Sequence, residues 1–183
     1  MIKIEALTQR TLKEAVDLVN IVFPDQGEEP ANIGFPASLN PEKYKDFLSK
    51  TQILLSKIQI PELRYWVAID DSGRVVGTIG LYCYEKDKEE AYWLGWFCVD
   101  PATRKQGVGT RLLRFCIEKT KKQGKKFLRL WTTTDPNELD AHRLYEKYGF
   151  KLVREEQFGD TALKKLYYEL KLEECSGGKE CLC

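Results

Sequence analysis

One short segment constrains the fold of this 183-residue chain more than any other: RKQGVGT, residues 104–110, lies between a predicted strand and a predicted helix. The strand pattern is EAYWLGWFCVD, rich in aromatic and β-branched residues, and the helical pattern is RLLRFCIEKTKKQG. The first turn of a helix leaves main-chain N–H groups without intrahelical acceptors. Gly107 and Gly109 allow the backbone to approach a ligand closely. The segment therefore predicts an anion site where the chain passes from strand to helix.

The charges and the glycine spacing narrow the kind of anion. The helix dipole contributes partial positive charge, and Arg104 and Lys105 add full charges, so a phosphate or pyrophosphate fits this turn. A dinucleotide fingerprint would need a third glycine where Leu112 stands, and a Walker phosphate loop would need Gly-Lys-Ser/Thr, which is missing. Both motifs are excluded. For an isolated Gly-x-Gly, an ordinary turn with solvated basic residues is the alternative.

The remaining patterns predict one α/β domain. Apolar residues make up 43% of the sequence, which suits one substantial core, and 183 residues are too few for two comfortable domains. The three strands between residues 63 and 100 should form an antiparallel meander, and the segment from Pro24 to Pro41 predicts a long loop. Strands are expected at residues 2–7, 63–70, 74–85, 90–100, 126–134, 150–158 and 162–172, and helices at residues 12–23, 42–58, 111–124 and 136–149.

Capping residues predict where the helices begin and end. Thr11 should cap the first helix, and Asn40 should cap the second. Asp135 should cap the last helix, with Glu138 completing a capping box and Gly149 ending the helix.

Charge balance and the N-terminal sequence exclude some classes of partner. The chain has 29 basic and 28 acidic residues, so it lacks the overall field of a general nucleic-acid binder. The basic run KTKKQGKK, residues 119–126, has no interleaved aromatics and is better explained as a solvated helix end. The N-terminus MIKIEALTQR has no long apolar run, so neither a signal peptide nor a membrane anchor is expected. We expect a cytoplasmic protein that binds neither nucleic acid nor membranes.

The cysteines divide into two groups. Cys83, Cys98 and Cys116 lie in apolar segments and should be buried free thiols. The other three, Cys175, Cys181 and Cys183, lie in residues 173–183, which we expect to form a flexible tail after a single domain of residues 1–172. Three thiolates could hold a soft metal, but a closed zinc site needs four ligands, so no metal is expected.

Two motifs resemble those of the GCN5-related N-acetyltransferase (GNAT) family. VDPATRKQGVGTRLL, residues 99–113, is similar to the family's acetyl-CoA-binding motif, in which a strand ends in Val-x-Pro and Arg/Gln-x-x-Gly-x-Gly/Ala opens an amphipathic helix. About thirty residues downstream, AHRLYEKYGF, residues 141–150, is similar to the second motif, Ala-x-x-Leu-Tyr-x-x-x-Gly-Phe. Their order and spacing make the resemblance more specific than either motif alone.

The resemblance implies a fold and a set of cofactor contacts. It implies a mixed, twisted sheet of about six to seven strands flanked by about four helices, splayed between the strand ending at Val99 and the strand KFLRLWT, with acetyl-CoA in the cleft. The main chain of Phe97, Cys98 and Val99 would pair with the pantetheine arm, and an N–H near Phe97 would donate to the thioester oxygen. The residues expected at the pyrophosphate are Arg104, Lys105, Gln106, Gly107, Val108, Gly109 and Thr110.

Tyr145 is the candidate general acid in the second motif. It shares a helix face with Ala141, Leu144 and Tyr148, so it could also be an ordinary core aromatic. A phenol with a pKa near ~10 can protonate a departing thiolate whose conjugate acid has a pKa near ~8.5. The family position favours the general acid, and Tyr145 is counted among the cofactor contacts.

No general base is assigned, because the sequence lacks a carboxylate at the position where some relatives have one. Some relatives have a glutamate where Trp93 stands. Glu90 and Glu85 flank the preceding turn and are better explained as solvated hairpin charges. His142, the only histidine, is expected on the surface. Relatives often have asparagine where Glu138 stands.

The expected function is transfer of an acetyl group from acetyl-CoA to a primary amine. A small-molecule or peptide amine is the expected acceptor, and a homodimer is possible by analogy with the family. The loop from Pro24 to Leu39 and the aromatics Tyr92, Trp93 and Trp96 would wall the acceptor site. Acidic residues in that loop could attract an amine: Asp25, Glu28 and Glu29. A non-catalytic acyl-CoA sensor on the same fold is the alternative.

Overall fold

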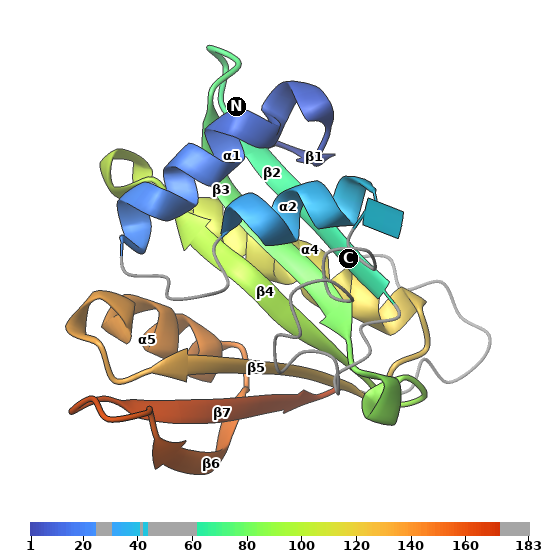
Figure 1. Cartoon of the computed structure of the whole chain (residues 1–183), viewed down its shortest axis with the longest axis vertical. Helices are drawn as coiled ribbons and strands as arrows, with labels where there is room; N and C mark the ends of the chain where they lie inside the picture. The colour runs from blue at the N-terminus through green and yellow to red at the C-terminus, as the bar shows by residue number, and fades with distance from the viewer. Residues whose placement is uncertain (25–30, 41, 44–61, 173–183) are drawn as a thin grey trace.

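The computed structural model describes residues 1–24, 31–40, 42–43 and 62–172 (Figure 1). The described strands are β1 Lys3–Ala6, β2 Glu62–Ile69, β3 Val75–Cys83, β4 Ala91–Val99, β5 Phe127–Thr133, β6 Lys151–Gln157 and β7 Lys164–Lys171. The described α-helices are α1 Gln9–Val22, α2 Ala31–Leu39, α4 Val108–Lys122 and α5 Leu139–Lys147. Short 3-10 helices span Glu85–Asp87, Pro101–Thr103 and Pro136–Glu138.

The strands form one mixed sheet of seven strands in the order β1-β2-β3-β4-β5-β7-β6. Neighbouring strands are antiparallel except for the parallel pair β4 and β5. This pair is short: Ala91 lies opposite Phe127, Tyr92 opposite Leu128 and Trp93 opposite Arg129. Beyond Trp93 the two strands diverge, as Figure 1 shows. The expected α/β class, the meander and the splayed mixed sheet are confirmed.

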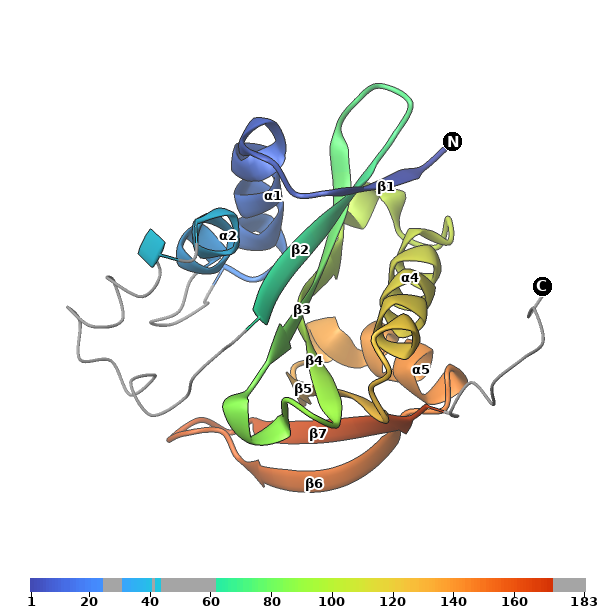
Figure 2. The same cartoon turned by 90° about the vertical axis from the view of Figure 1, so that its right-hand side faces the viewer.

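Helices cover both faces of the sheet (Figure 2). The amphipathic helix α4 buries Leu112, Leu113, Cys116 and Ile117 in a core that also receives Tyr145 of α5. Helices α1 and α2 pack on the opposite face, over a second core containing Tyr65, Val67 and Cys98. Between these two layers, β4 contributes side chains to both cores.

The first helix begins earlier than the sequence suggested. Thr8, not Thr11, is the N-cap residue of α1. Thr11 lies in the first turn, where its Oγ1 accepts a hydrogen bond from the Thr8 N–H at 3.1 Å. Either threonine could cap a helix chemically. Thr8 is the cap here because the side chain of Thr11, in the first turn, accepts a hydrogen bond from the Thr8 N–H, as in a capping box.

The expectation of a continuous loop from Pro24 to Pro41 is wrong, because residues 31–39 form α2 in spite of an internal Pro36. Phe35 is completely buried and packs edge-on against Tyr65, with ring centroids 4.4 Å apart. This burial outweighs the poor helix propensity of proline and glycine. Asn40 was expected to cap the second predicted helix, and its Oδ1 accepts a hydrogen bond from the Lys43 N–H at 3.1 Å. Most of the helix predicted at residues 42–58 lies outside the described residues.

The last helix also starts differently. Asp135 caps the 3-10 turn Pro136–Glu138 by accepting from the Asn137 N–H at 2.8 Å, and α5 follows from Leu139. Glu138 does not complete a capping box, because its carboxylate binds residues of β5 instead. Gly149, with φ +85°, stands where the helix was expected to end.

The cysteines and the C-terminal tail were the subject of two further expectations. Cys83, Cys98 and Cys116 are buried free thiols, as expected. The tail at residues 173–183 lies outside the described part of the chain. Among the helices that the structure describes, none has the length and apolar character needed to cross a membrane.

The packing of Tyr65 over Gly80 gives a test of the fold. A Cβ at position 80 would lie 2.3 Å from Tyr65 Cε1, so we expect Gly80→Ala to lower the free energy of unfolding by about 1–3 kcal/mol. Urea denaturation measures the change. Gly34→Ala is the control: its Cβ would lie 3.4 Å from the Tyr65 hydroxyl, and alanine favours the helix by about 0.5–1 kcal/mol. A Gly80→Ala protein as stable as wild type would contradict this packing.

Candidate functional site

The site begins with a bulge in β4 at the point where this strand leaves β5. Thr78 pairs with Cys98 and Gly80 with Gly95, so Ile79 alone lies opposite two residues, Trp96 and Phe97. Trp96 has φ +39°, which is rare for a bulky residue. The Thr78 hydroxyl donates to the Trp96 carbonyl oxygen at 2.7 Å and thereby stabilises this conformation. A bulge of this kind redirects the main chain of a strand next to a functional site.

Beyond the bulge, Asp100 forms two contacts where the chain enters the glycine turn. The carboxylate of Asp100 accepts from the Ala102 N–H at 2.8 Å and pairs with Arg74 at 3.2 Å. These contacts connect the end of β4 to the β2–β3 turn.

The main-chain N–H groups from Arg104 through Thr110 donate no hydrogen bond to any residue that the structure describes. The first main-chain bond of the following helix runs from the Arg111 N–H to the Gly107 oxygen at 3.0 Å. Lys105, with φ +60°, and Gly107, with φ +81°, adopt left-handed conformations. Successive free N–H groups in such a turn form a concave anion-binding surface at a helix N-terminus.

The side chains around this turn leave it open. A Cβ at Gly107 would meet no heavy atom within 4 Å. A Cβ at Gly109 would lie 3.5 Å from Phe97 and Val99 of β4 and 3.6 Å from Leu144 of α5. The start of α4 thus lies close to both the bulged strand and α5. Arg104 and Lys105 are exposed, and Arg104 Nε lies 3.4 Å from the Val99 oxygen.

Tyr145 lies on the inner face of α5, next to the bulge. Its ring centroid is 6.1 Å from that of Phe97, and the residue is only 6% exposed. Its hydroxyl has no hydrogen-bond partner among the described residues, yet it is not sealed from solvent. Burial raises the pKa of Tyr145, and the Glu138 charge raises this pKa further. The phenol therefore remains protonated at neutral pH.

His142 is buried, so the expected surface position is wrong. It is 9% exposed, its Nε2 lies 3.3 Å from Thr132 Oγ1, and its ring packs near Tyr168. The reason is geometric: residues three apart share a helix face, so His142 and Tyr145 both face the sheet.

The carboxylates at the other end of β4 are bound to one guanidinium. Arg129 forms ion pairs with Asp87 at 3.1 Å, Glu90 at 2.8 Å and Glu169 at 2.7 Å. Asp87 also accepts from the Trp93 indole at 2.8 Å. Glu90 is therefore an ion-pair partner where β4 and β5 are joined, although its side chain is still 44% exposed, as expected for a hairpin charge. The side chain of Glu85 lies outside the described part.

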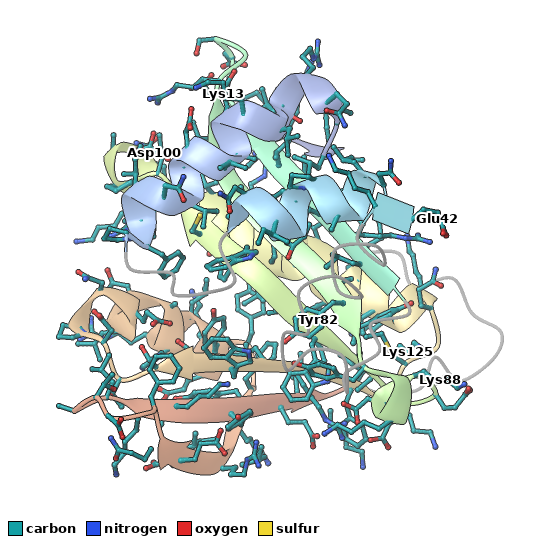
Figure 3. All side chains as sticks on the ribbon, viewed as in Figure 1. Lys13, Glu42, Tyr82, Lys88, Asp100 and Lys125 are labelled. Atoms are coloured by element: carbon teal, nitrogen blue, oxygen red, sulfur yellow. The ribbon has the colours of Figure 1, made fainter. Side chains whose placement is uncertain are left out.

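The predicted aromatic wall divides between the two faces of the sheet. Tyr92 belongs to the α4 core, whereas Trp96 belongs to the core under α1 and α2. Sequence analysis missed Tyr82, which lies over Gly95, its Cδ1 3.2 Å from the position of a Cβ there. Figure 3 shows Tyr82 on the face that carries α1 and α2. Gly95 in the strand sequence could have indicated this contact, because a glycine within a strand often marks a close approach by another group.

A second missed group lies at the end of β5. The carboxylate of Glu138 accepts hydrogen bonds from the hydroxyls of both Thr132 and Thr133. The sequence pattern placed Glu138 in a capping box, which concealed this contact.

Comparisons with known proteins agree with this architecture. The profile of the acetyltransferase (GNAT) family matches residues 34–150. An N-acetyltransferase from Staphylococcus aureus Mu50 superposes with a TM-score of 0.70 at 16% identity, covering 94% of this chain and 99% of that one. An aminoglycoside 6'-N-acetyltransferase complexed with coenzyme A superposes with a TM-score of 0.68 at 17% identity, covering 92% of this chain and 96% of that one. The ribosomal-protein-S18-alanine N-acetyltransferase of Escherichia coli superposes with a TM-score of 0.64 at 18% identity, covering 98% of this chain and 99% of that one. No curated protein matches the sequence.

Proposed function

Because this chain belongs to the acetyltransferase (GNAT) family, we propose that it transfers an acetyl group from acetyl-CoA to a primary amine. The observation that carries this proposal is the run of free N–H groups from Arg104 through Thr110 at the start of α4. A pyrophosphate offers acceptor oxygens and negative charge to such a turn. The coenzyme A complex of a structural relative supports the choice of ligand.

In this proposal the turn binds the pyrophosphate mainly through its main chain. The N–H groups donate to the phosphate oxygens, and the dipole of α4 favours the negative charge. The exposed side chains of Arg104 and Lys105 add charge from outside. Since these donors are fixed before binding, little ordering free energy is lost when the ligand enters.

The edge of β4 that faces β5 would hold the pantetheine arm. Past Trp93 this edge has no pairing with β5, so its main-chain groups are available to an extended ligand. Phe97, Cys98 and Val99 would pair with the amide groups of the arm. The Phe97 N–H would donate to the thioester oxygen and stabilise the negative charge that develops there.

Tyr145 would protonate the departing thiolate. Its burial keeps the phenol protonated, and the same dry environment raises the basicity of a thiolate formed beside it. The raised pKa of Tyr145 therefore does not by itself prevent the transfer, since both partners are shifted in the same direction.

A non-catalytic acyl-CoA sensor on this fold is the second candidate. The observations that favour it are Trp93 at the place of a possible base and the ion pair that occupies Glu90. A sensor would bind acetyl-CoA and release no thiol with any amine.

The ligand-binding part is tested by calorimetric titration with acetyl-CoA. We expect Gly107→Glu to weaken binding at least a hundredfold, because the new side chain places a negative charge beside the pyrophosphate and strains a residue at φ +81°. Gly124→Glu is the matched control: it has φ +70°, equally open surroundings and a position at the other end of α4. Equal affinity for both variants would remove the turn from the site.

The catalytic part is tested by thiol release with Tyr145→Phe. We expect kcat to fall by about 10²–10⁴-fold while the Kd for acetyl-CoA changes less than threefold. Since burial raises the pKa of Tyr145, its proton is lost only at strongly alkaline pH, so the wild-type rate should show no decline from this group below pH ~10. Unchanged turnover in Tyr145→Phe would assign it to packing alone.

A further inference from the structure

An amine that attacks a thioester must lose a proton, and the described carboxylates near Trp93 do not serve this need. Asp87, Glu90 and Glu169 are all bound to Arg129 at the closed end of the β4–β5 pair. The reaction proposed above would occur at the open end, near Phe97. A proton acceptor is therefore needed at that end.

Glu138 is the carboxylate that the fold places there. One of its oxygens, Oε1, accepts from Thr133 Oγ1 at 2.5 Å, and the other, Oε2, accepts from Thr132 Oγ1. Successive strand residues point to opposite faces of a sheet. The carboxylate thus spans the end of β5 and reaches a hydroxyl on each face.

Contacts at the end of β5 place the Glu138 carboxylate near Tyr145. Thr132 Oγ1 donates to Glu138 and lies 3.3 Å from His142 Nε2. The ring of Tyr168 lies 6.0 Å from that of His142 and 6.1 Å from that of Tyr145. Tyr145 in turn lies 6.1 Å from Phe97, where the proposed thioester would lie, and the Glu138 charge contributes to the raised pKa of Tyr145.

The two threonine hydroxyls differ in what they can still bind. Thr133 Oγ1 donates to Glu138 and accepts from the Asp135 N–H at 3.2 Å, which leaves one lone pair for another donor. Thr132 Oγ1 gives its single proton to Glu138 and has His142 Nε2 at 3.3 Å as its other neighbour. Only Thr133, on β5's last position, combines a free acceptor site with a bond to the carboxylate.

We propose that Glu138, acting through the Thr133 hydroxyl, is the general base that accepts the proton of the attacking amine. This inference rests on the proposed acetyl transfer. As the C–N bond forms, an amine N–H bond breaks and its proton passes to Thr133 Oγ1, while the Thr133 proton passes to Glu138 Oε1. The C–S bond breaks with its electron pair on sulfur, which takes the Tyr145 proton. Return of the Glu138 proton to Tyr145 restores both groups.

Other titratable groups face this relay and bear on its pH dependence. They are Asp135 in the connection, His142 and Tyr145 on α5, and Lys165 and Tyr168 on β7. None of them bonds to the carboxylate of Glu138 in the described part of the chain, whose partners are the two threonines.

The test compares Glu138→Gln, Thr133→Val and Thr132→Val in the thiol-release assay. The probe is whichever of four amines reacts fastest with wild type: an alanine-starting peptide, a lysine peptide, spermidine or kanamycin. We expect Glu138→Gln and Thr133→Val to lower kcat by about 10²–10⁴-fold at pH 7.5, with the Kd for acetyl-CoA changed less than threefold. The loss should shrink as the pH rises, by up to about tenfold per pH unit, because hydroxide in solution can then accept the amine proton in place of Glu138.

Thr132→Val is the matched control, since it removes an equivalent hydrogen bond to the same carboxylate from the other face. We expect its kcat to stay within fivefold of wild type. Similar losses in both threonine variants, or a loss in Glu138→Gln that does not depend on pH, would reduce Glu138 to positioning α5. A wild-type protein that binds acetyl-CoA but acetylates none of the amines would instead overturn acetyl transfer, and the relay with it.

Discussion

The parallel contact between β4 and β5 is the constraint on which the rest of the structure depends. It consists of three residue pairs and then ends. If the pairing continued to Val99, the edge of β4 would be saturated and the Phe97 main chain would face another strand. Because it ends, the bulge, the start of α4 and the inner face of α5 lie close together where the two strands separate. The short contacts of Gly109 with Phe97, Val99 and Leu144 measure how closely these elements approach.

Opposite ends of this strand pair have opposite electrostatic character. At the closed end a guanidinium that is 19% exposed forms ion pairs with three carboxylates, so this end is acidic and its one cation is fully engaged. Removing the guanidinium would leave three neighbouring carboxylates without their cation. At the open end the helix dipole, Arg104 and Lys105 are uncompensated within the described residues. The second arrangement, unlike the first, is therefore suited to the anion of the proposed ligand.

Local patterns predicted the glycine turn, the meander and the inner face of α5, because each is specified by residues close together in sequence. Gly107 adopts a left-handed backbone that favours glycine, and the position of Tyr145 followed from helical spacing. Contacts between distant segments decided the rest. Helix α2 forms because Phe35 packs on Tyr65, and His142 is buried because β5 and β7 lie under α5. The bulge at Trp96 depends on Thr78 of another strand, which no spacing within β4 could reveal. Glu138 was assigned to a cap because its true partners lie on β5.

Hydrogen–deuterium exchange with and without acetyl-CoA tests the central claim most directly, namely that the free N–H groups from Arg104 through Thr110 bind the ligand. The amides of this segment have no acceptors in the described structure, so they should exchange rapidly in the free protein. The account predicts that acetyl-CoA slows exchange there by at least tenfold and also protects the amides of Phe97 to Val99. Protection confined to other segments, with residues 104–110 unchanged, would contradict the account.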